Sequence, residues 1–213
     1  MGTIETLSLA MGAAWTSGIN LYATVAVLGI ANLAQMIQLP PDLQVLSHPA
    51  VIGIACTMYV IEFFADKVPY VDSGWDVVHT FIRVPAGAIL AARSLGDMNP
   101  ALELAALLAG GSIALAAHGM KATTRLAINA SPEPFSNWAA SVTEDIAVLG
   151  SLWLIFHHPL VMLFLLAGFI ALIIWLAPKI FRLAKRGFQA LRNKIGGVKP
   201  DQPAPSGTAS QPT

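Results

Sequence analysis

The sequence predicts an all-α polytopic membrane protein, with six transmembrane helices in a compact bundle followed by a basic amphipathic helix and a disordered tail. The 213-residue chain is 55% hydrophobic and only 11% charged, whereas soluble domains are about 45–50% apolar and about 25% charged. Prolines separate its apolar segments, and most of its basic residues lie in the last forty positions. These three features exclude an ordinary soluble domain.

Six apolar segments are long enough to cross a hydrocarbon core of about 30 Å at a helical rise of about 1.5 Å per residue. They cover residues 7–34, 49–66, 75–93, 101–121, 138–156 and 159–177. The first is longer than a straight crossing needs. Its middle reads TSGIN (16–20), where Gly18 between polar residues predicts a kink or local unwinding, although simple tilt explains the length equally well.

Small residues indicate which segments pack inside the bundle, because they let helix backbones approach closely. The third segment contains the small-residue run PAGAILAA, and the sixth is bulky and apolar throughout, so we expect the sixth on the outside, against lipid. The small or hydroxylated stripes lie at Ala13, Ser17, Asn20 and Thr24 in the first segment and at Ala105, Ala109, Ser112 and Ala116 in the fourth.

Positive charges predict the orientation, because Lys and Arg concentrate on the cytoplasmic side. With six crossings, Lys67, Lys121, Arg125 and the basic tail share one side, and the other side has only Arg93. Both termini are therefore expected in the cytoplasm of a bacterium, with the chain in the inner membrane.

Three regions follow from these segments: a transmembrane domain at 1–178, a basic amphipathic helix at 179–197 and a disordered tail at 198–213. The helix is expected to bind anionic lipids, and a solvated extension of the last crossing is the alternative. Nothing in the chain predicts nucleic-acid binding, and its oligomeric state cannot be predicted.

Charged residues recur at helical spacing near the predicted cytoplasmic ends. A charge at membrane depth costs at least about 2.5 to 3.5 kcal/mol unless it faces the bundle interior or a partner. We therefore expect Arg83 to contact Glu144 or Asp145, with Glu62 and Lys121 as further partners. The candidate polar core or ion-binding site comprises Asn20, Glu62, Asp66, Asp76, His79, Arg83, His118, Lys121, Arg125, Glu144 and Asp145.

Two functions fit this pattern. A water-accessible cytoplasmic cavity would move a small solute or ion, whereas a fully paired, dry network would belong to a non-catalytic scaffold or accessory subunit. An enzyme is not expected, because no HExxH, GxSxG, Walker-type loop or Cys/His cluster occurs, although Glu144, Asp145 and His118 could in principle act as acid and base. No cofactor is predicted, and the adjacent pair His157 and His158 lacks the further ligands of a metal site.

Three stretches resemble a bacterial membrane family catalogued as domain of unknown function 4126. They are GINLYATV, EFFADKVPYVDSGWD with RVPAGA, and HGMKATTRLAINASPEPFSNW followed by SVTEDIAVL. The resemblance covers nearly all of the six segments and stops before the tail. It implies no activity, and the matching positions are Gly18, Asn20, Glu62, Asp66, Lys67, Asp76, Arg83, Pro85, Lys121, Arg125, Asn137, Glu144 and Asp145.

Overall fold

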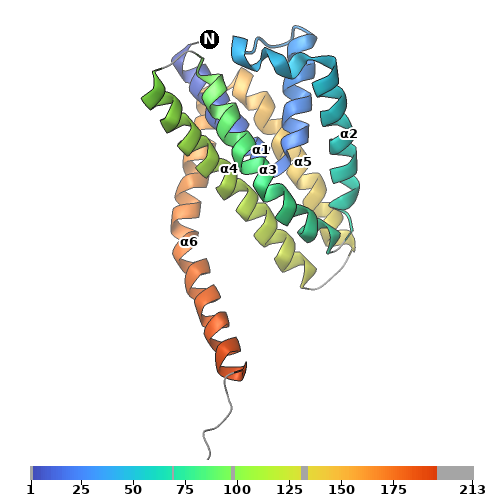
Figure 1. Cartoon of the computed structure of the whole chain (residues 1–213), viewed down its shortest axis with the longest axis vertical. Helices are drawn as coiled ribbons and strands as arrows, with labels where there is room; N and C mark the ends of the chain where they lie inside the picture. Colours follow the sequence, from blue (N-terminus) through green and yellow to red (C-terminus); the bar gives the residue numbers. More distant parts are fainter. Residues whose placement is uncertain (1, 69, 97–98, 131–133, 196–213) are drawn as a thin grey trace, which may run out of the picture. The chain divides into compact units, whose positions relative to one another are not determined.

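All regular structure in the described residues, 2–68, 70–96, 99–130 and 134–195 of the computed structural model, is helical (Figure 1). The predicted all-α class is thus confirmed for this part of the chain. In order, the elements are α1 (Thr3–Leu33), the 3-10 helix η1 (Pro41–Ser47), α2 (Pro49–Ala65), α3 (Val71–Ser94), α4 (Pro100–Asn129), α5 (Pro134–His157) and α6 (Pro159–Ile195).

The chain forms two compact units, Met1–Ala171 and Leu172–Thr213. In the first unit, α6 buries Met162 and Leu166 and leaves most of its other apolar side chains exposed, as expected of a helix that faces lipid. In the second unit α6 continues to Ile195, so the start of the predicted interfacial helix at 179–197 is helical, although most of its side chains lie outside the described residues. The predicted tail at 198–213 lies outside them entirely.

Four helices in the described part of the chain are long and apolar enough to cross a membrane: Thr3–Leu33, Pro100–Asn129, Phe135–His157 and Pro159–Lys179. A fifth candidate combines η1 with α2, which meet at 64°. The 24 residues of α3 are also long enough, but buried charged side chains lower its hydropathy. The chain is therefore a multi-pass membrane protein.

Helix α1 is broken at Asn20, whose φ of −145° and ψ of 96° lie outside the helical region. The Asn20 side-chain oxygen accepts the Ala23 N–H at 2.9 Å, so Asn20 caps the N-terminus of a second half-helix. Thr24 donates its hydroxyl to the Asn20 carbonyl at 2.8 Å. The kink predicted in TSGIN is confirmed, and tilt alone does not account for the length of α1.

The two halves of α1 run back toward the same end of α5. Glu5, before the break, and Met36, just beyond the end of α1, line one cavity together with Ile155. Gly12, in the first half, also lies against Ile155. The helix is therefore a hairpin whose tip is at Asn20, and its two ends lie on the same side of the bundle (Figure 1).

Small residues hold α1, α3 and α4 at close range. A side chain on Gly18 would meet Ala114, and one on Gly110 would meet Ala91, so neither position has room for a Cβ. The predicted stripe on the first segment is buried, which confirms that face of α1.

The stripe predicted for the fourth segment was wrong. Ala105, Ala109 and Ser112 are exposed and Ala116 is half-buried. The buried face comprises Ala106, Gly110, Ile113, Ala114 and Ala117. Alanines occur on every face of this helix, so small size carries no information about which face packs.

Candidate functional site

The charged side chains meet where the C-terminal ends of α2 and α4 approach the N-terminal ends of α3 and α5, beside the tip of α1 (Figure 1). Because α3 begins at Val71, residues spaced four, three and four apart share one helical face. These residues, Asp72, Asp76, His79 and Arg83, are all buried. The polar residues of α3 therefore form one buried stripe.

Arg83, at the centre of this cluster, has no exposed side-chain surface. Its guanidinium pairs most closely with Glu62 of α2, and it reaches Asp76 at 3.3 Å and His118 at 3.1 Å. The predicted contact with Glu144 or Asp145 was wrong, because α3 brings Arg83 beside the end of α2 while α5 faces Arg125. The predicted partnership with Glu62 is confirmed.

Lys121 of α4 lies among four carboxylates. Its Nζ is 2.8 Å from Asp66, 3.2 Å from Glu62, 3.5 Å from Glu144 and 3.9 Å from Asp76. It also donates to the carbonyl oxygen of Ile19 at 3.3 Å. One ammonium group therefore links α2, α3 and α5 to the break in α1.

Arg125, one helical turn further along α4, forms a bidentate salt bridge with Glu144. Nη2 lies 2.7 Å from Oε2 and Nε lies 3.2 Å from Oε1, the geometry that makes arginine–carboxylate pairs strong. Arg125 also donates to the carbonyls of Asp66 at 2.8 Å and Asn137 at 3.2 Å. It thereby ties the end of α2 to the start of α5.

A layer of hydrogen-bonded side chains covers the outer end of the cluster. Asn129 donates its amide to Asp72 at 2.8 Å and accepts from Asn137 at 2.9 Å. Asp72 also accepts the N–H of Ser73 in the first turn of α3. Lys67 donates to Ser141 at 3.3 Å beside this layer.

The break in α1 presents two half-helix ends to the charges. The carbonyl of Ile19, at the C-terminal end of the first half, faces the cation Lys121. Asn20, at the N-terminal end of the second half, donates to the carboxylate of Asp145 at 3.3 Å. Each end faces the charge that its helix dipole favours, as in transporters whose broken helices form ion sites.

The hydrogen bonds of His118 define a neutral ring. His118 donates Nε2–H to the carbonyl of Asp76 at 3.0 Å, so Nδ1 accepts from Arg83 at 3.1 Å. His79 donates Nδ1–H to the carbonyl of Trp75 at 2.8 Å, and its Nε2 shares a hydrogen bond with the Tyr22 hydroxyl at 3.1 Å. The His118 ring therefore adds no positive charge to the cluster.

The ion-paired set carries an excess of negative charge, and some of its atoms are unpaired. The ion-paired set has four carboxylates, Glu62, Asp66, Asp76 and Glu144, against three cations, Arg83, Lys121 and Arg125. The atoms without a hydrogen-bond partner are Glu62 Oε2, Asp66 Oδ1, Asp76 Oδ2 and Arg83 Nε. No three His, Cys, Asp or Glu side chains in the described residues could hold a metal ion.

A groove of about 280 Å³ reaches the cluster from the side, between α4 and α5. Its walls are mainly apolar and include Trp15, Met120 and Phe169, and Lys121 and Glu144 contribute its charges. The Glu144 side chain is 16% exposed, more than the other carboxylates of the ion-paired set. The groove therefore gives the buried charges a route to the surroundings.

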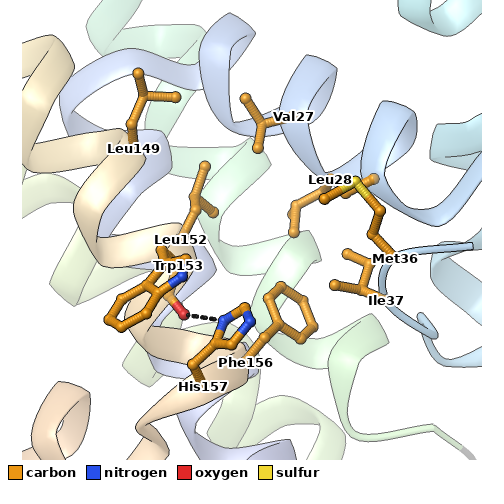
Figure 2. A pocket seen from close by; sticks show the side chains of 10 residues that line it. Val27, Leu28, Met36, Ile37, Leu149, Leu152, Trp153, Phe156 and His157 are labelled. Carbon is orange, nitrogen blue, oxygen red and sulfur yellow. Dashed lines mark hydrogen bonds between the residues drawn. The ribbon is translucent and has the colours of Figure 1, made fainter. Parts of the chain in front are cut away.

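A second cavity of about 200 Å³ lies at the other end of α5 and contains no part of the cluster. Figure 2 shows Val27 and Leu28 of α1 facing Leu152 and Phe156 across it. The His157 ring stacks on Trp153 and bonds to its carbonyl at 3.0 Å. This apolar cavity lies between the second half of α1 and the C-terminal end of α5.

Most of the predicted site residues come together in this cluster. Asp145 lies at its edge, hydrogen-bonded to Asn20 rather than ion-paired, and His79 contributes through Tyr22. Sequence reasoning missed Asn129 and Tyr22. Asn129 lies four residues after Arg125 on the same face of α4, so extending the predicted helix by one turn would have found it. Nothing in the local sequence marks Tyr22.

The fold and the cluster define the chain as a multi-pass membrane protein whose helices converge on buried, paired charges. The sequence profile described as Domain of unknown function (DUF4126) matches residues 7–179, and the chain belongs to that family. No curated protein and no solved structure matches the chain.

Proposed function

We propose that the chain moves a small ion or solute across a bacterial inner membrane through the charged cluster. The observation that carries this proposal is the break at Asn20, which exposes two half-helix ends to buried charges. A broken helix at membrane depth is tolerated where its backbone lines a cavity or meets protein groups. Intramembrane charges that face one another commonly mark ion pathways.

The arrangement of Lys121 supports movement of charge. Because four carboxylates lie within 4 Å of its Nζ, Lys121 can exchange partners through small side-chain rotations. An incoming cation could take its place at one carboxylate without leaving another acid alone. The lateral groove brings such an ion to Glu144 first.

We also propose five membrane crossings, α2 to α6, with α1 as a re-entrant hairpin. The ends near Lys67, Lys121 and Arg125 then face the cytoplasm under the positive-inside rule. Since both ends of α1 lie on the opposite side from these residues, the N-terminus faces away from the cytoplasm. This arrangement replaces the expectation of six crossings with both termini inside.

Cysteine labelling tests this topology. In a Cys56→Ala background, we expect Thr3→Cys to react with a membrane-impermeant maleimide on intact spheroplasts. Ser206→Cys should react only after the membrane is opened. Protection of both positions until opening would restore six crossings.

Flux through proteoliposomes tests the transport proposal. We expect the native protein to conduct protons, alkali cations or a small metabolite faster than empty vesicles, and Glu144→Gln to reduce that rate to the empty-vesicle level. Glu103→Gln is the matched control, because Glu103 is exposed near the start of α4, and it should conduct like the native protein. Equal rates for all four preparations would reject transport.

The alternative is a scaffold or accessory subunit, in which the cluster only fixes how the helices pack. The nearly complete pairing of Arg83, Lys121 and Arg125 favours it, since buried ion pairs can serve specificity. The flux experiment separates the two functions. That the chain is not an enzyme stays a prediction.

A further inference from the structure

We propose that the cluster binds one exchangeable proton and that Asp76 is the carboxyl group that carries it. The inference names the ion of the function proposed above and rests on that function for its role in transport. In the protonated state the proton is bonded to a carboxyl oxygen of Asp76. On release that O–H bond breaks, the carboxylate keeps the electron pair, and the proton passes to water or a neighbouring acceptor.

Within the ion-paired set, the side chains supply one positive charge too few. Four carboxylates face three cations, the further buried cation Lys67 bonds to the Phe63 carbonyl and to Ser141 instead, and the hydrogen bonds of His118 leave its ring neutral. A net negative charge among side chains this deeply buried is costly. One bound proton removes it.

The unpaired atoms supply an independent sign of a missing hydrogen. Asp76 is 2% exposed, and its Oδ2 has no hydrogen-bond partner. A carboxylate oxygen can only accept, whereas a protonated one donates. Glu62 Oε2 and Asp66 Oδ1 are buried acceptors of the same cluster without a donor, so a proton on one carboxyl group adds the kind of donor that the cluster lacks.

Asp76 is the most weakly held of the four carboxylates. Its Oδ1 meets Arg83 at 3.3 Å and Lys121 at 3.9 Å. By contrast, Asp66 lies 2.8 Å from Lys121 and Glu144 lies 2.7 Å from Arg125. The carboxylate with the longest ion pairs loses least when it takes up a proton.

The surroundings of Asp76 come from every helix of the site. On its own helix it faces Arg83, and from α4 it faces Lys121 and His118. The negative charges nearby are Asp66 at the end of α2 and Glu144 of α5. Loss of the proton would draw Arg83 and Lys121 toward Asp76. Both cations bind Glu62 as well, so protonation changes the ties between α2, α3 and α4.

Infrared spectroscopy of the purified full-length protein tests this inference without measuring flux. At neutral pH we expect the C=O stretch of a protonated carboxylic acid, shifted in deuterated water and by carbon-13 aspartate but not by carbon-13 glutamate. The band should be lost in Asp76→Asn. It should persist in Asp72→Asn, where Asn129 and Ser73 already satisfy the carboxylate.

The isotope labelling uses the unmodified chain, so it remains informative if Asp76→Asn fails to fold. Absence of a carboxylic acid band, or a band that follows glutamate, would overturn the assignment. A band that survives in folded Asp76→Asn would also overturn it. A carboxylic acid band without flux would reject the transport proposal and retain the proton site. Flux without the band would retain the transport proposal and reject the proton site.

Discussion

Replacing Arg83 by methionine is expected to lower the free energy of unfolding by about 3–5 kcal/mol, the usual cost of leaving a buried charge unpaired. Methionine matches the aliphatic part of the arginine side chain, so the substitution removes the charge together with the volume of the guanidinium. Glu62 loses its closest cation and Asp76 loses the nearer of its two. His118 also loses the donor to its Nδ1.

The measurement is unfolding by denaturing detergent in mixed micelles, followed by circular dichroism. Arg93→Met is the matched control, because Arg93 lies on the same helix, is 54% exposed and meets Asp42 at 3.6 Å. An exposed pair of this kind contributes about 0–1 kcal/mol. Equal losses for the two variants would contradict a buried ion-paired centre.

A second substitution tests whether the cost comes from uncompensated charge. Adding Glu62→Gln to Arg83→Met should recover part of the lost stability, because it removes the carboxylate that lost its partner. The two changes are then non-additive, as expected for residues in direct contact. Additive losses would mean that packing, not charge, dominates at Arg83.

Helical spacing predicted which charges would meet more accurately than it predicted how they would pair. The polar faces of α3 and α4 follow from positions three and four apart, and the cost of exposing charges to lipid favours their meeting inside the bundle. These faces comprise Asp72, Asp76, His79 and Arg83 on α3 and His118, Lys121 and Arg125 on α4. Pairing depends on the depth and rotation of neighbouring helices. The sequence predicts that Arg83 contacts Glu144 or Asp145 of α5, but its closest partner in the structure is Glu62 of α2.

The hairpin in α1 shows what a hydropathy window cannot detect. Residues 7–34 are apolar on average, so a hydropathy window finds one long crossing, and the length and composition of Thr3–Leu33 still allow one. The direction after the break depends on a single residue, Asn20, whose side chain caps the second half-helix. The proximity of distant segments, such as Glu5 and Met36 lining one cavity, is needed to show that the chain turns back.

Replacing Lys121 by methionine should produce a loss of similar size, about 3–5 kcal/mol at neutral pH, but one that depends strongly on pH. The substitution leaves the buried set with two more negative charges than positive ones unless protons bind. The folded state of the Lys121→Met protein should therefore bind more protons than its unfolded state. Acidification then stabilises the variant, since stability rises toward the condition that favours the state with more bound protons.

The free energy of unfolding is measured for the unmutated protein and for Lys121→Met across a pH series. The difference between the two values should decrease as the pH falls. Lys179→Met is the control, because Lys179 is exposed and lies over the ring of Trp175, so it should show no gap that varies with pH. A constant gap for Lys121→Met would mean that the neighbouring carboxylates are compensated by another group.

The same substitution probes the break in α1, because Lys121 is the donor to the Ile19 carbonyl. Without it, that carbonyl loses its bond in a buried site, at a cost of about 1–3 kcal/mol. Backbone amides after Asn20, such as that of Ala23, should then exchange with deuterium faster than in the native protein. Acid can neutralise the carboxylates by protonating them, but it supplies no donor to the Ile19 carbonyl. The faster exchange should therefore persist at low pH, after correction for the intrinsic pH dependence of exchange. If acid instead abolishes it, the hairpin depends on the charge balance rather than on this hydrogen bond.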